Sequence, residues 1–205
     1  MRIWIISLTA CALWACSISK DTSTVEGALG SLAESISSGD EGLFYQALTQ
    51  KSHEELASSL KLLKEIDRQL SNFPAKVQPW ARKEAFGDLP DLPTVSQEQQ
   101  LFFKIVQKQW GRVKTQPSEE IYQGLIPKSL RNDNDNETAV HTRTQEKWTL
   151  KKEGAVWKVA VFETPLEEYK KTLEESLKII EENLKEIKHR RSLNLPLPKM
   201  ITKGG

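Results

Sequence analysis

The stretch TAVHTRTQEKWTLKKEGAVWKVAVFE (residues 138–163) carries the clearest β-strand pattern of the chain. Apolar and polar residues alternate on both sides of Glu153–Gly154, which predicts an antiparallel hairpin with a two-residue turn at that dipeptide. In that register Leu150 lies opposite Trp157. We therefore predict a sheet with one buried face. That face carries five apolar side chains: Trp148, Leu150, Trp157, Val159 and Val161.

Apolar residues at helical spacing predict four helices before the hairpin. The first begins at Ser23 or Thr24 and ends at the SSGD sequence, and the second covers Glu41–Leu48. The third runs from Ser52 to about Leu70, and the fourth from Ser96 to about Trp110. Ser52 and Glu55 have the spacing of a capping box, which marks the start of the third helix. Residues 121–127 favour a strand, and the polar residues 129–137 favour a loop.

Residues 73–95 interrupt the helical pattern with prolines at positions 74, 79, 90 and 93. Proline lacks a backbone donor and breaks regular elements. We therefore predict an irregular insertion. Its aromatic residues either plug the core or form a lid over a pocket, and the sequence leaves both interpretations open.

A long amphipathic helix is predicted after the hairpin, over residues 164–191. Thr164, Pro165 and Glu167 fit the cap, the first position and the third position of a helix start. Residues 192–205 are predicted to be an extended or disordered tail. Together these patterns predict an α+β fold, in which N-terminal helices pack on a small antiparallel meander sheet and a long C-terminal helix follows.

The apolar stripe of this last helix allows two interpretations. The stripe either packs back on the sheet and the first helices, or its distal part pairs with another helix. The second interpretation predicts a homo-oligomer or an assembly with another protein. Its partner-binding residues would be Leu173, Ile180, Leu184 and Ile187.

The N-terminal sequence MRIWIISLTACALWACSISKD (residues 1–21) has the organisation of a secretory leader. Arg2 precedes an uncharged run that extends to Ser19 and contains a short apolar core and small residues. The run is at the lower end of the length that spans a bilayer, so an uncleaved membrane anchor is the alternative.

Both cysteines of the chain lie in this leader, in the sequences LTAC and LWAC, which resemble the lipobox of bacterial lipoproteins. The resemblance implies an acylated cysteine as membrane anchor, a signal peptide over residues 1–15 and a tether over residues 16–23. We favour Cys16, because the apolar core before Cys11 is short, and Cys11 is the alternative. Ser17 after the anchor implies the outer membrane, facing the periplasm. Two cysteines without such a role are the remaining interpretation.

Several classes of protein are excluded by what the mature chain would lack. Cleavage before Cys16 leaves no thiol for a nucleophile, a disulfide or a metal site. With 29 basic and 28 acidic residues, the balanced charge argues against nucleic acid as a partner. His53, His141 and His189 lack metal-ligand spacing, and no nucleotide-binding or nucleophile motif is present. We therefore expect neither a metal nor a cofactor.

The aromatic residues of the insertion and the apolar face of the hairpin define a candidate pocket. Its residues are Trp80, Phe86, Glu146, Trp148 and Trp157. Alternation places Glu146 on the core face beside Trp148, where it is either a rim residue at the edge of the sheet or a buried acid in a pocket. A buried acid has a raised pKa and can act as a general base. An enzyme would pair it with His141, although strict alternation puts these two side chains on opposite faces.

Residues 24–163 resemble the NTF2-like superfamily in the order of their elements. A first helix ends at SGD, the short helix EGLFYQAL and further helix follow, and the segment closes with the hairpin WTLKKEGAVWKV. The resemblance implies a curved sheet with a pocket and carries over no catalytic residue. The insertion at 73–95 and the C-terminal helix depart from the family. We expect a non-enzymatic envelope lipoprotein that binds a small apolar ligand or another envelope protein. The alternatives are an assembly factor that self-associates through the final helix and, less favoured, an NTF2-like hydrolase or isomerase.

Overall fold

The computed structural model describes residues 21–87, 92–110, 127–134, 136–142 and 147–198. It has the α+β fold predicted from the sequence, with a long C-terminal helix. The helices are α1 (Val25–Ser38), α2 (Glu41–Gln46), α3 (Gln50–Leu70), α4 (Gln78–Phe86), α5 (Glu98–Trp110) and α7 (Glu163–Ser192), with a 3₁₀ turn at Leu92–Thr94. The strands are β1 (Pro127–Asn134), β2 (Glu137–Thr142), β3 (Lys147–Glu153) and β4 (Val156–Val159).

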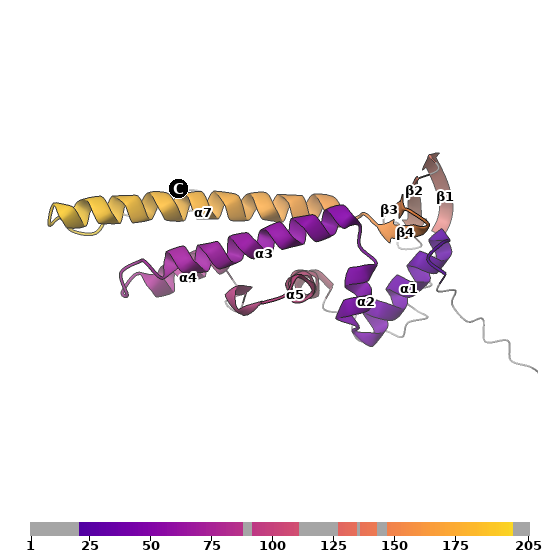
Figure 1. The fold of residues 1–205 in the computed structure, drawn as a ribbon, viewed down its shortest axis with the longest axis horizontal. Helices are drawn as coiled ribbons and strands as arrows, with labels where there is room; N and C mark the ends of the chain where they lie inside the picture. The colour runs from indigo at the N-terminus through magenta and orange to yellow at the C-terminus, as the bar shows by residue number, and fades with distance from the viewer. Residues whose placement is uncertain (1–20, 88–91, 111–126, 135, 143–146, 199–205) are drawn as a thin grey trace, which may run out of the picture.

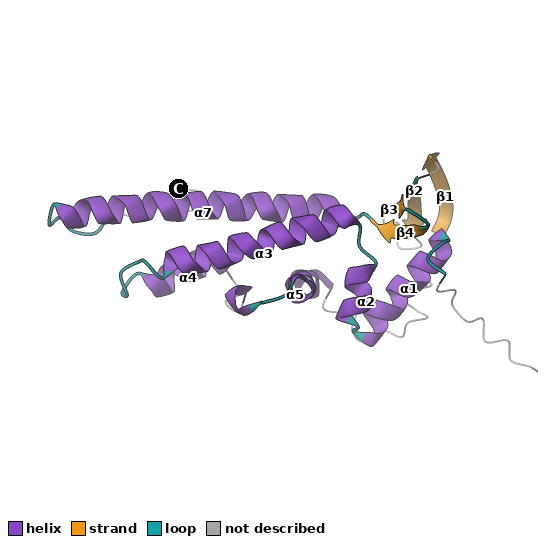
Figure 2. Ribbon diagram, viewed as in Figure 1, coloured by secondary structure: helices purple, strands orange, loops and turns teal. Residues whose placement is uncertain are grey.

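The molecule is elongated. Helices α3 and α7 lie side by side along its length, and the sheet lies at one end with α1 and α2 (Figure 1). Helix α4 lies beside the far half of α3, away from the sheet (Figure 2). The four strands are paired in chain order, β1-β2-β3-β4, and each neighbouring pair is antiparallel. The predicted meander is therefore confirmed.

The register of the β3–β4 hairpin differs by two residues from the prediction. Leu150 pairs with Val159 and not with Trp157, so the predicted pairs are wrong. The predicted face is nevertheless right, because a shift of two residues leaves every side chain on the same side of a strand. Trp148, Leu150 and Val159 are buried, and Trp157 is half-buried.

The turn of this hairpin explains the shift. The last pair is Glu153 with Val156, so the turn residues are Gly154 and Ala155. Gly154 has a φ of +63°, which a glycine adopts without strain at the first position of a two-residue type II′ turn. We predicted this glycine at the second position of the turn. The turn therefore lies one residue later in the chain than predicted, which shifts the strand pairs by two residues.

Strand β1 is a further departure from the sequence. The predicted strand at residues 121–127 lies outside the described residues except for Pro127. The predicted loop at 129–137 is wrong, because Pro127–Asn134 forms β1 and pairs with β2. The segment is too polar for an apolar alternation to reveal it, and backbone pairing with β2 forms the strand.

The outer edge of β4 is covered by the first helices. The backbone N–H of Val159 donates to the carbonyl of Ala47 (2.8 Å), and that of Trp157 donates to the carbonyl of Thr22 (2.7 Å). Leu48 and Val159 form a parallel bridge. The N-terminal end of the described chain therefore lies next to the sheet.

The starts of α3 and α7 differ from the local capping signals. The cap of α3 is Thr49, three residues before the predicted Ser52. Helix α7 begins at Glu163, so the predicted cap Thr164 is inside the helix. The cap of α3 is still local, since the Thr49 hydroxyl accepts from the backbone N–H of Ser52 at 3.3 Å. The start of α7 has no side-chain cap.

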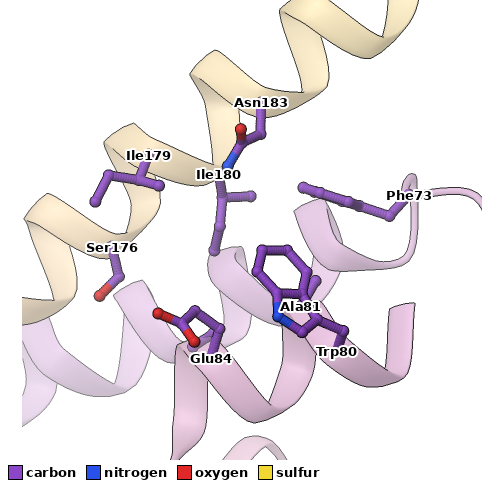
Figure 3. A pocket seen from close by; sticks show the side chains of 9 residues that line it. Phe73, Trp80, Ala81, Glu84, Ser176, Ile179, Ile180 and Asn183 are labelled. Atoms are coloured by element: carbon purple, nitrogen blue, oxygen red, sulfur yellow. The ribbon is translucent and has the colours of Figure 1, made fainter. Parts of the chain in front are cut away.

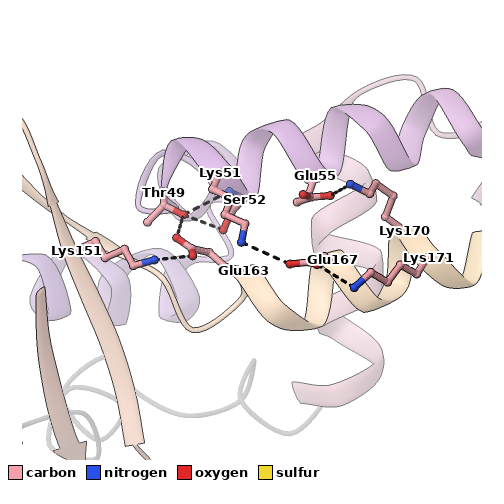
Figure 4. Close-up of polar contacts among 9 residues, drawn as sticks. All are labelled: Thr49, Lys51, Ser52, Glu55, Lys151, Glu163, Glu167, Lys170 and Lys171. Carbon is pink, nitrogen blue, oxygen red and sulfur yellow. Dashed lines mark hydrogen bonds and ion pairs between the residues drawn. The ribbon is translucent and has the colours of Figure 1, made fainter.

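Helices α3 and α7 are parallel. A ladder of polar contacts connects them, and residue numbers rise together on both sides (Figure 4). The steps are Thr49 with Glu163 at 2.9 Å, Lys51 with Glu167 at 3.4 Å, and Glu55 with Lys170 at 2.6 Å. The N-terminal ends of both helices therefore lie together, next to the sheet.

The carboxylate of Glu163 connects these two helix starts to the sheet. It is 7% exposed, accepts a hydrogen bond from the hydroxyl of Thr49, and forms an ion pair of 2.7 Å with Lys151 of β3. A negative charge is favourable where two helix dipoles present their positive ends. The hydrogen bond to Glu163 raises the pKa of Lys151, so the contribution of the lysine charge is present at neutral pH and is lost as pH rises through that raised value.

A second carboxylate from the hairpin caps the same helix start. The backbone N–H of Gln50, at the first position of α3, donates to both carboxylate oxygens of Glu153, at 2.9 and 3.2 Å. This N–H has no partner within the helix. On the other side of the turn, Lys158 donates to the carbonyl of Gln46 at the end of α2. The hairpin thus fixes the α2–α3 connection from both sides.

An aromatic cluster surrounds the start of α7. The rings of Phe44 and Phe102 meet edge to face at 5.1 Å, and both contact Phe162, at 6.0 and 5.1 Å. Trp148 of β3 reaches the same ring at 6.2 Å. Such contacts contribute beyond the area that they bury. The cluster joins α2, α5 and the sheet at the residue that precedes α7.

The apolar stripe of α7 is covered within the chain. It packs against α3, one of the helices before the hairpin, so the interpretation in which the helix folds back is right for the helices. It is wrong for the sheet, because α7 extends away from the sheet (Figure 1). The predicted partner-binding residues Leu173, Ile180, Leu184 and Ile187 are all buried. Their assignment as an exposed surface for another helix is therefore wrong.

The proline-rich insertion is more regular than predicted. Residues 78–86 form α4, and Pro79 lies in its first turn. A proline at this position is tolerated, because the backbone N–H that it lacks would have no partner within the helix. Residues 88–91 lie outside the described part of the chain.

Removing the carboxylate of Glu163 should destabilise the fold. We expect Glu163→Ala to lower the free energy of unfolding by about 2 kcal/mol, because the buried Thr49 hydroxyl loses its acceptor and two helix starts lose a favourable charge. Urea unfolding followed by circular dichroism measures this loss. Glu168→Ala, at an exposed position in the next turn of the same helix, is the control and should change stability by less than about 0.5 kcal/mol. Equal losses in both variants would contradict the assignment.

The hydroxyl of Tyr169 is buried and has no hydrogen-bond partner among the described residues. Burial raises the pKa of Tyr169 to about 12. The folded state therefore keeps the phenol neutral at a pH where the unfolded chain ionises it, and stability decreases as pH rises from about 10 to 12.

Tyr169→Phe should therefore stabilise the protein, by about 1 kcal/mol at neutral pH. Its advantage over the native chain should increase between pH 10 and 12, as measured by urea unfolding at each pH. Tyr45→Phe is the matched control and should destabilise, since the Tyr45 hydroxyl donates a 2.6 Å hydrogen bond to Glu98. A loss of stability in Tyr169→Phe at neutral pH would show that the hydroxyl has a partner.

Candidate functional site

The candidate site is an apolar groove between α4 and the middle of α7 (Figure 3). The groove holds about 350 Å³ of space, part of which is open to solvent. Its apolar lining comes from α4, from α7 and from the connection before α4: Phe73, Trp80, Ala81, Ala85, Ile179 and Ile180.

The groove exists because α4 presents small residues to α7. Ala81 and Ala85 are four residues apart and therefore lie on one face of the helix. Trp80 stands beside them and is 39% exposed, which is unusual for so large an apolar side chain. On the opposite wall, Ile180 is buried. An apolar side chain that entered the groove would contact both helices.

Three polar residues also line the groove: Glu84, Ser176 and Asn183. Ser176 and Asn183 are buried, and the Ser176 hydroxyl donates to the carbonyl of Thr172 at 2.6 Å. Glu84 is exposed at the rim, where its carboxylate is the one ionisable group of the lining. The groove thus combines an apolar floor with one negative charge.

The pocket predicted from the sequence is not assembled. Trp80 lines the groove, and Phe86 is buried at the end of α4. Trp148 and Trp157 belong to the sheet at the opposite end of the molecule (Figure 1). Glu146 lies outside the described residues. The prediction failed because it assumed that the insertion folds over the sheet, whereas α4 follows α3 away from it.

The Tyr45 side chain belongs to a cluster of polar and aromatic contacts with His53 and Glu98. Its hydroxyl donates to Glu98, and its ring stacks on His53 with centroids 4.2 Å apart. His53 Nε2 lies 2.8 Å from the backbone carbonyl oxygen of Tyr45. Burial and the hydrogen bond to Glu98 raise the pKa of Tyr45. These groups bond to one another, so we interpret the cluster as a joint between α2, α3 and α5.

The histidines are not brought together. His141 is exposed on β2, His189 is exposed near the end of α7, and His53 is in the joint described above. Within the described ranges, no three His, Cys, Asp or Glu side chains are grouped as a metal site would require. No helix in those ranges is both long and apolar enough to cross a bilayer. Cys11 and Cys16 lie outside the described residues, so their predicted lipidation stays a prediction.

The signal for the groove is present in the sequence PWARKEAF (residues 79–86), where Trp80, Ala81 and Ala85 recur at helical spacing. A proline in the first helical turn does not interrupt such a pattern. Reading each proline as a helix breaker concealed this short amphipathic helix.

The chain was compared with family models, with curated proteins and with solved structures. No family model matches it, and neither a curated protein nor a solved structure does. The resemblance to the NTF2-like superfamily therefore stays a prediction from the hairpin sequence.

Proposed function

We propose that this chain is a non-enzymatic, lipid-anchored envelope protein that binds another envelope protein through the groove between α4 and α7. The observation that carries the proposal is the half-exposed Trp80 beside an open apolar groove. Tryptophan at the edge of a desolvated pocket is the side chain that most often dominates the energy of a protein interface.

The position of the groove supports a tethered binding protein. The chain enters the fold at the sheet end, where the carbonyl of Thr22 bonds to β4. The groove is lined by α4, and α4 lies beside the half of α3 that is away from the sheet (Figure 1). A lipid anchor on Cys16, as the lipobox resemblance implies, would therefore hold the membrane at one end and leave the groove accessible at the other.

The shape and charge of the groove favour a protein segment over a small ligand. Sites for small molecules enclose most of their ligand, whereas this groove is shallow and open to solvent. Glu84 at its rim favours a cation next to the entering residue. We therefore propose a partner segment in which a large apolar residue is adjacent to lysine or arginine.

The two alternative functions, self-association and catalysis, are supported by fewer structural observations. Self-association through the final helix would require a surface other than the apolar stripe, which α3 covers. An enzyme built on Glu146 and His141 would need a residue outside the described part of the chain and one that is exposed to solvent.

The anchor is tested by the intact mass of the mature N-terminal peptide from the native host. We expect a peptide that begins at Cys16 and carries a diacylglyceryl group and a further acyl chain, since two or more chains give a stable anchor. Modification of Cys11 instead would keep the anchor and move the cleavage site. An unmodified N-terminus would contradict the lipoprotein proposal, and an intact Met1 would make the leader itself the anchor.

The groove is tested in the native host with a photo-crosslinking amino acid in place of Lys83, which is exposed beside the rim. We expect a crosslink to one envelope protein at an apolar–basic segment, and no such product from the same substitution at Lys61 on α3. The segment is then made as a peptide, and its affinity for the full chain is measured.

Trp80→Ala and Glu84→Lys should each weaken this peptide, the first by at least tenfold because the tryptophan is the apolar anchor of the site. Trp157→Ala, at the opposite end of the molecule, is the matched control and should leave the affinity unchanged. Unchanged binding in Trp80→Ala would rule out the groove as the binding site.

A further inference from the structure

The C-terminal end of α7 is strongly basic. Residues 187–205 read IKHRRSLNLPLPKMITKGG and contain no acidic residue. Lys188 and Arg191 are exposed in the last turn of the helix, and Arg190 is half-buried and paired with Glu186 at 2.6 Å. The helix dipole accounts for positive charge in this turn, but it does not account for the apolar residues that follow.

Three leucines follow this turn and are exposed to solvent: Leu193 by 54%, Leu195 by 50% and Leu197 by 45%. In the described ranges, the large apolar side chains that are exposed are these three leucines and Trp80. All four therefore belong to the end of the molecule away from the sheet. A soluble surface rarely gathers its large apolar residues in one place without a binding role.

The structure holds the first leucines directly beside the basic turn. The backbone N–H of Leu195 donates to the carbonyl of Arg190 (2.9 Å), and that of Asn194 donates to the carbonyl of Arg191 (3.2 Å). Asn194 has a φ of +53°, so the helix ends in a Schellman motif with asparagine in the left-handed position. The leucines and the cations consequently form one surface, which we call the C-terminal tip (residues 188–198).

We propose that the C-terminal tip binds the surface of an anionic phospholipid membrane. Glu186 pairs with Arg190, which leaves Lys188 and Arg191 as the exposed cations beside the leucines. Exposed leucines next to these cations match an interface in which apolar side chains enter the acyl boundary and cations lie at the phosphates. A nucleic acid would use the cations and leave the leucines in water. The inference concerns a different surface from the groove, and it holds whether or not the proposed function is correct.

The position of the C-terminal tip determines which membrane it reaches. Helix α7 has 30 residues, so it spans roughly 45 Å between the sheet and the tip. The chain enters the fold at the sheet end (Figure 1). If the N-terminal anchor is present, the tip faces away from the anchoring membrane and contacts a second anionic surface.

The two signals should act together. Each cation near an anionic surface contributes about a fivefold gain in partitioning, and this gain decreases with added salt. The leucines make the binding persist beyond what charge alone supports. Binding should therefore require anionic lipid and should be lost when either group of side chains is removed.

The experiment uses the full chain reconstituted by its anchor into phosphatidylcholine vesicles. These are mixed with second vesicles of phosphatidylcholine alone, or of equal parts phosphatidylcholine and phosphatidylglycerol, and tethering is measured by energy transfer between lipid dyes. We expect tethering of the anionic vesicles only. Lys188→Gln with Arg191→Gln should reduce it by at least tenfold. The triple variant Leu193→Ser, Leu195→Ser and Leu197→Ser should abolish it.

The matched control is Lys61→Gln with Lys64→Gln, which removes the same charge from an exposed face of α3 and should change tethering less than twofold. Circular dichroism checks that each variant is folded. Two results would overturn the proposal outright: equal tethering of neutral vesicles, and an equal loss of tethering in the control variant. Tethering that occurs only when both vesicle populations carry protein would also overturn it and would indicate that the partner is a second copy of the chain. If the chain does not insert into neutral vesicles, the anchor proposal fails, and the same variants are compared by flotation of the free chain with anionic vesicles.

Discussion

The buried carboxylate of Glu163 is the contact on which the arrangement of the helices depends. Two parallel helices bring their positive dipole ends together, and this alignment is unfavourable unless negative charge is placed there. Glu163 supplies that charge, and its two oxygens bond to Thr49 of α3 and Lys151 of β3. One side chain therefore sets where α7 begins, which residue of α3 it meets and how the pair is oriented to the sheet.

The lengths of the parallel helices then explain where the candidate surfaces lie. Helix α3 has 21 residues and α7 has 30, so α7 extends beyond its neighbour by roughly 14 Å. Helix α4 lies beside this far part of the pair, and its alanines leave the groove open next to Trp80. The C-terminal tip lies further along the same helix. Both proposed surfaces are thus placed at one end by a helix that is fixed at the other.

The sequence predicted the features that depend on local periodicity. The α+β class, the long last helix and the buried face of the hairpin follow from repeats of 3.6 and 2 residues. The hairpin register depended on the turn position of Gly154, which alternation alone does not fix. The start of α7 at Glu163 and the strand at 127–134 arise from contacts between distant residues, so no local pattern could predict them. The groove was missed because Pro79 was taken to exclude a helix, whereas it lies in the first turn of α4.

The parallel orientation of α3 and α7 also has a kinetic consequence. Thr49 and Glu163 are separated by 114 positions in the chain, and the polar ladder above them keeps a similar separation. Parallel neighbours cannot be joined by a short turn, so α3 is synthesised long before the helix that covers its apolar face. Contacts of high sequence separation slow folding and prolong the exposure of such surfaces. Until α7 is synthesised, the leucines of α3 lack their cover and are open to chaperones, and the arrival of α7 limits the rate of folding.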